Sequence, residues 1–119
     1  MDQEQMKQRT KEFAKAVIHL CRQLPRTPEA RLISAQVFRS GTSVGANYRA
    51  ACRGRSKPDF ISKLGIALEE ADETLYWLEI MRETGVACPE AVAPLISDAN
   101  QIVAIFVATL NTAKRGESA

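Results

Sequence analysis

Proline and glycine divide this chain into four long segments, and this division constrains the fold more than any other feature. The breaks fall at residues 25–28, 54–56 and 85–89. Within each segment the apolar residues recur at spacings of three, four and seven, which is typical of amphipathic helices. Short connections between long helices favour antiparallel neighbours. We therefore predict an all-α single domain, an antiparallel up-down-up-down four-helix bundle, with helices at about residues 3–24, 28–53, 57–84 and 89–114.

Helix start and stop signals support these boundaries. Thr27 is placed to cap the second helix, and Pro28 suits its first position, where a missing N–H costs nothing. Ser56 and Asp59 have the spacing of a helix start, and Gly85 suits the left-handed residue that ends a helix. We expect the chain to fray from Arg115 onward.

Two glycines interrupt the second helix. Gly41 and Gly45 each cost about 1 kcal/mol relative to alanine inside a helix. The apolar phase before Ser40 nevertheless continues unchanged after Gly45. We therefore predict one continuous helix, in which the small residues let another helix approach closely.

Length and cysteine usage limit the class of protein. The 119 residues are enough for one domain. The three cysteines contain no CxxC pair and the first residues are polar, so we expect reduced thiols and a cytoplasmic protein. The uncharged run at residues 99–113 is shorter than the roughly 20 apolar residues of a membrane span, so we expect a core helix and no membrane contact.

Catalytic motifs are missing from the sequence. His19 is the single histidine, and no zinc-protease, nucleophile-elbow, phosphate-loop or dinucleotide motif occurs. Di-iron bundles need Glu-x-x-His pairs, and the acidic residues near Glu69 have no histidine in register. We expect a protein that is not an enzyme, with no cofactor and no metal.

Charge is distributed unevenly along the chain. Residues 1–57 contain twelve Lys or Arg and four Asp or Glu, a net charge of +8, whereas residues 58–119 contain four and ten, a net charge of −6. The basic half could attract a polyanion. Alternatively, the two halves complement each other within one bundle or between subunits.

The second helix carries a polar line at spacings of four, three and four: Gln36, Ser40, Ser43 and Asn47. These side chains share one face, with Gly41 and other small residues beside them. One explanation is a tight helix–helix seam, with hydrogen bonds to a facing helix at Glu69 or Glu73. The other is a face that contacts a partner. We favour the seam, because glycine inside a helix usually reflects close packing.

A cluster of cations surrounds the end of the same helix. Arginine forks suit phosphate oxygens, and cations also favour the C-terminal end of a helix through its dipole. The candidates for nucleic-acid contact are Arg39, Arg49, Arg53, Arg55 and Lys57.

The residues 39–83 resemble the core of the 23S-rRNA-intervening-sequence protein family. The matching stretch begins RSGTSVGAN and continues through DF, KL and an acidic run to YWL. The resemblance implies a four-helix bundle that assembles as a homopentamer, and a relation to accessory proteins of diversity-generating retroelements. In such an assembly Trp77, beside the acidic run, could lie in a subunit interface or in the bundle core.

These observations lead to two functional hypotheses. The first is a non-catalytic homo-oligomer that binds nucleic acid, structured RNA before DNA, through its basic surface. The alternative is a protein-interaction scaffold or accessory subunit with no direct nucleic-acid contact, in which the basic residues serve subunit or partner-protein contacts.

Overall fold

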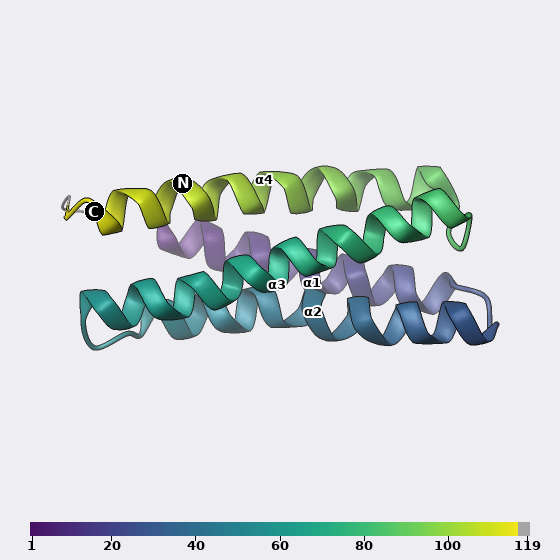
Figure 1. The fold of residues 1–119 in the computed structure, drawn as a ribbon, viewed down its shortest axis with the longest axis horizontal. Coiled ribbons are helices and arrows are strands. Elements are labelled where there is room, and N and C mark those ends of the chain that lie inside the picture. The colour runs from purple at the N-terminus through teal and green to yellow at the C-terminus, as the bar shows by residue number, and fades with distance from the viewer. Residues whose placement is uncertain (117–119) are drawn as a thin grey trace.

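A computed structural model describes residues 1–116 of the chain, and residues 117–119, part of the segment expected to fray, lie outside the described residues. The described chain forms four α-helices and no strand (Figure 1). They are α1 (Gln3–Gln23), α2 (Pro28–Cys52), α3 (Lys57–Thr84) and α4 (Pro89–Lys114). The predicted antiparallel four-helix bundle is confirmed, and each predicted helix boundary agrees to within one residue.

The helices follow one another around the bundle in chain order. Each packs against the next, and α1 also touches α4 along a smaller contact that closes the ring. The α1–α2 and α3–α4 turns lie at one end, while the α2–α3 turn and both termini lie toward the other (Figure 1). The result is a rod of 47 × 20 × 19 Å. Because α1 and α2 are neighbours, the basic half of the sequence becomes one long side of this rod.

Side-chain caps explain where the helices begin. The Asp2 carboxylate accepts the Gln5 backbone N–H in a capping box, and the Thr27 and Ser56 hydroxyls accept backbone N–H groups of α2 and α3. Each such bond satisfies a donor that has no partner within the helix. Gly85 ends α3 with φ +74°, a conformation that favours glycine.

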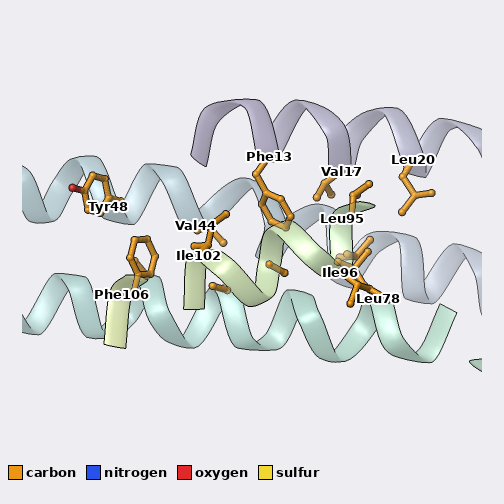
Figure 2. Packing of buried hydrophobic residues seen from close by; sticks show 14 of the residues in the cluster. Phe13, Val17, Leu20, Val44, Tyr48, Leu78, Leu95, Ile96, Ile102 and Phe106 are labelled. Carbon is orange, nitrogen blue, oxygen red and sulfur yellow. The ribbon is translucent and has the colours of Figure 1, made fainter. Parts of the chain in front are cut away.

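Apolar residues from all four helices fill the centre of the rod (Figure 2). The largest fully buried side chain is Phe106 of α4. Its ring stacks on that of Tyr48 of α2, with the centroids 5.5 Å apart and the planes 8° from parallel. This pair joins two helices that lie diagonally opposite each other.

The two glycines of α2 face α1. A Cβ atom on Gly41 would lie 2.9 Å from two methyl carbons of Val17, and one on Gly45 would lie 3.0 Å from the Thr10 hydroxyl oxygen. Gly41 therefore has no room for a side chain, whereas a side chain at Gly45 would require Thr10 to shift by a few tenths of an ångström. The predicted close approach of another helix is therefore confirmed, and that helix is α1.

The apolar stretch of α4 is longer than the uncharged run at residues 99–113 alone indicates. By length and composition alone its 26 residues are long and apolar enough to cross a membrane, so the short run at residues 99–113 does not exclude a span. A core helix passes the same test, and α4 packs along α3 with Ile102 and Phe106 fully buried. Part of its apolar character is thus used in the bundle core.

Candidate nucleic-acid interface

Most cations of the basic half make no ion pair. Lys7, Lys15, Arg9 and Arg39 each pair with a carboxylate. The other eight of the twelve have no ion pair to any residue of the described chain, and they are Lys11, Arg22, Arg26, Arg31, Arg49, Arg53, Arg55 and Lys57. Ion pairs within one bundle therefore neutralise only a minority of the positive charges of residues 1–57.

Arg49 lies at a hollow between α1 and α2. The hollow has a volume of about 180 Å³, and Lys7 and Lys11 of α1 also line it. Its remaining lining residues are small, Gly45 among them, together with the Thr42 hydroxyl. Lys7 pairs with Glu4 at 3.0 Å, an exposed contact that contributes little stability. Three cations thus surround a shallow site on the outer face of the bundle.

A second basic hollow lies on the same two helices, toward the α1–α2 turn. It has a volume of about 510 Å³, and Arg22, Arg26, Arg31 and Phe38 are among its lining residues. We call the six cations of the two hollows the α1–α2 basic face: Lys7, Lys11, Arg22, Arg26, Arg31 and Arg49. Of these six, only Arg49 is among the nucleic-acid contacts predicted from the sequence.

The predicted cluster at Arg53, Arg55 and Lys57 lies at the α2–α3 turn, and all three are exposed. The Arg55 backbone N–H donates to the Asp59 carboxylate at 3.2 Å, and the Lys63 ammonium lies 3.1 Å from the same oxygen. These contacts lower the pKa of Asp59, with the hydrogen bond from Lys63 as the main cause. The Asp59 carboxylate is therefore held by Arg55 and Lys63, and neither Arg53 nor Lys57 forms an ion pair within the described chain.

Arg39 is placed differently from the other predicted cations. Its guanidinium forms ion pairs with Glu70, at 3.1 Å, and with Glu73 of the adjacent α3. The hydrogen bond to Glu73 is the main cause of a raised pKa for Arg39. The arginine thus ties α2 to α3, and its pairing with two carboxylates argues against the predicted phosphate contact.

The polar line of α2 lies along α3, but only one member bonds across the seam. The Ser40 hydroxyl is fully buried and lies 2.8 Å from that of Thr74. Ser43 and Asn47 donate instead to carbonyls of their own helix, at 2.7 and 2.8 Å. The expectation that Glu69 or Glu73 would accept these bonds is wrong, because helix carbonyls four residues back are already within reach. Gly41, expected in the same seam, faces α1.

The buried hydroxyl pair gives a testable contribution to stability. Thr74→Val keeps the shape but leaves the Ser40 hydroxyl with only the Val37 carbonyl, 3.5 Å away. We expect the free energy of unfolding to fall by about 1–3 kcal/mol, since a buried polar group loses its partner. Thr84 makes the same bond within its helix but is exposed, so Thr84→Val should cost at most about 0.5 kcal/mol. Urea unfolding of both variants measures the difference, and equal losses would contradict it.

The acidic side of the bundle carries the aromatic residues of the expected interface. Trp77 is half-buried and donates to the Glu73 carboxylate at 3.3 Å. Tyr76 is 54% exposed and meets Trp77 edge-on, with ring centroids 5.1 Å apart. Glu69 is exposed beside them. Trp77 is therefore neither a fully buried core residue nor free on the surface.

No group of His, Cys, Asp and Glu residues in the described chain is arranged to hold a metal ion. His19 is exposed on α1. Burial raises the pKa of the Cys21 thiol, the opposite of what an activated nucleophile requires. The α1–α2 basic face instead offers positive charge, which suits binding of an anion.

The missed residues of the basic face had a local signal. Lys7 and Lys11 are four residues apart, and eighteen residues, five helical turns, separate Arg31 from Arg49. Each pair therefore shares one face of its helix. Which helix would lie beside that face depends on tertiary packing, and the spacing does not contain that information.

The fold and surface define a small all-helical bundle whose two long sides differ in charge. A family model described as 23S rRNA-intervening sequence protein matches residues 2–108, so the chain belongs to this family. It is also similar to a crystal structure of a protein with unknown function from the S23 ribosomal protein family of Bacteroides thetaiotaomicron VPI-5482. The two share 37% identity with a TM-score of 0.86, over 94% of this chain and 100% of that chain. No curated protein matches the chain.

Proposed function

We propose that this protein is a non-catalytic homo-oligomer of the cytoplasm that binds structured RNA through the α1–α2 basic face and the α2–α3 turn. The observation that carries the proposal is the group of eight cations without an ion pair on or beside two neighbouring helices. Arginine and lysine side chains that face water are available to phosphate oxygens. Membership of a family named after an rRNA insertion supports RNA as the polyanion.

The arginines of α2 and its following turn give the first test. We expect the Arg49/Arg53/Arg55→Ala variant to bind RNA more weakly, and the slope of log affinity against log salt to fall by about 3, since each phosphate contact releases counterions. Gel shifts and fluorescence anisotropy over a range of salt measure both quantities.

Arg39→Ala is the matched control, because Arg39 is an α2 arginine already paired with Glu70 and Glu73. Its salt slope should equal that of the wild type. A triple variant that binds like the wild type would refute the assignment of these arginines, and it would favour a scaffold with no nucleic-acid contact.

Exposed apolar residues support self-association through α2 and α3. Leu32, Ile66 and Tyr76 are 62%, 44% and 54% exposed, and the half-buried Trp77 lies next to Tyr76. Aromatic residues are enriched at protein interfaces. We propose a homopentamer, and light scattering should then give about five times the 13.1 kDa mass of the chain. A monomeric mass would contradict the proposal.

A further inference from the structure

The two hollows of the α1–α2 basic face form a matched pair. Each is bounded by both helices, each contains three cations, and no Asp or Glu lines either one. Apart from the exposed Lys7–Glu4 pair, these cations have no carboxylate partner within the described chain, and an accumulation of like charge costs stability through repulsion. Binding of an anion in each hollow would relieve that repulsion.

The spacing between the hollows is set by helix geometry. Lys11 and Arg22, on the α1 side, are three turns apart, or about 16 Å. Arg49 and Arg31, on the α2 side, are five turns apart, or about 27 Å. Because Gly41 and Gly45 let α1 and α2 pack closely, the two helices hold these four cations at fixed distances from one another. The hollows therefore present two phosphate-binding points at a rigid distance.

A rigid pair of phosphate sites suits a rigid polyanion. A single strand has to lose conformational entropy before it can bridge two fixed points, whereas a duplex is already stiff. Proteins that bind single strands compensate by stacking successive bases on aromatic side chains. Phe38, which lines the second hollow, is the one exposed aromatic residue beside the basic face in the described chain, and Tyr76 and Trp77 lie on α3. One ring cannot form a platform for successive bases.

We infer that the α1–α2 basic face binds the paired backbone of an RNA duplex, with backbone phosphates in both hollows, and does not read unpaired bases. This inference rests on the proposed function and names the form of RNA that the surface takes. In a structured RNA the binding sites are then the double-stranded stems. Recognition is by backbone shape and charge, as is common for double-stranded RNA.

The experiment compares an RNA duplex with an unpaired RNA strand of the same length, both fluorescently labelled, by anisotropy at fixed salt. We expect the duplex to bind at least about tenfold more tightly, because it is preorganised. Lys11→Ala/Arg49→Ala removes cations from the first hollow, and Arg22→Ala/Arg31→Ala removes them from the second. Each pair should lower the salt slope on the duplex by about 2.

Two further variants serve as controls. Arg82→Ala/Lys114→Ala removes the same charge from exposed residues of α3 and α4 that have no ion pair within the described chain, and it should leave the slope unchanged. Phe38→Ala should leave duplex binding unchanged.

The outcomes separate this inference from the function on which it rests. If the single strand binds as tightly as the duplex or more tightly, the duplex assignment is overturned while RNA binding stands. The same holds if Phe38→Ala lowers the affinity for RNA as much as a hollow variant does. Hollow variants that bind the duplex like the wild type overturn the assignment of the hollows. If neither form of RNA binds, the proposed function falls as well.

Discussion

Replacing Phe106 with alanine will lower the free energy of unfolding by about 3–5 kcal/mol, the range found when a large core aromatic is truncated. Phe106 is fully buried and stacks on Tyr48, which belongs to the diagonally opposite helix. Truncation removes the apolar ring and leaves a cavity in a packed core, and both effects add to the loss. Urea unfolding at one fixed protein concentration measures the loss.

The adjacent residue provides the control. Val107 is 41% exposed on the same turn of α4, so Val107→Ala should change stability by at most about 0.5 kcal/mol. Equal losses for the two variants would show that the ring does not lie in the core as described.

Leucine at Gly41 will also destabilise the protein, by about 1–3 kcal/mol or more, because the site is already full. Even the first carbon of a side chain would meet two methyl groups of Val17 at 2.9 Å. Val17 is fully buried and has no flexible end that could move aside. The helices α1 and α2 would have to separate, and the α1–α2 basic face would widen with them.

Gly65 of α3 is the matched control for this substitution. A Cβ atom there would meet nothing within 4 Å. Gly65→Leu should therefore stabilise the helix by roughly 0.5–1 kcal/mol, since glycine is a poor helix former. Thermal unfolding of both variants should show shifts of opposite sign, and a stabilising Gly41→Leu would contradict the close α1–α2 packing.

The fold could be predicted from the sequence because its determinants are local. Thr27 with Pro28 and Ser56 with Asp59 mark helix starts through bonds made within four residues, and the structure contains those bonds. The second helix could be predicted as continuous because the helical spacing of its apolar residues is the same before and after Gly41. Short turns then leave few arrangements for four helices of this length.

The candidate site was only partly predictable, because it depends on which helices become neighbours. Arg39 and Arg49 look alike in the sequence, yet Arg39 lies beside the acidic α3 and Arg49 beside Lys7 and Lys11 of α1. Both arginines follow an aromatic residue of the same helix, Phe38 and Tyr48. The difference arises from the side of α2 that each occupies, and only the packed bundle defines what lies there.

The seam of α2 shows the same limit. The polar line along one face was correctly placed from its spacing, and Ser40 does lie against α3. Its partner is Thr74, a residue that carries no signal in the sequence as a hydrogen-bonding group. Ser43 and Asn47 satisfy their own donors within the helix, which spacing alone does not reveal.

The most direct test of the account is a salt titration of RNA binding by the full-length protein, purified with nuclease so that no bound RNA remains. If the six cations of the α1–α2 basic face and the three of the α2–α3 turn contact phosphates, log affinity should fall linearly with log salt, with a slope of about −8 on an RNA duplex. An affinity that does not change with salt, or no binding at low salt, would contradict the assignment of this surface to RNA.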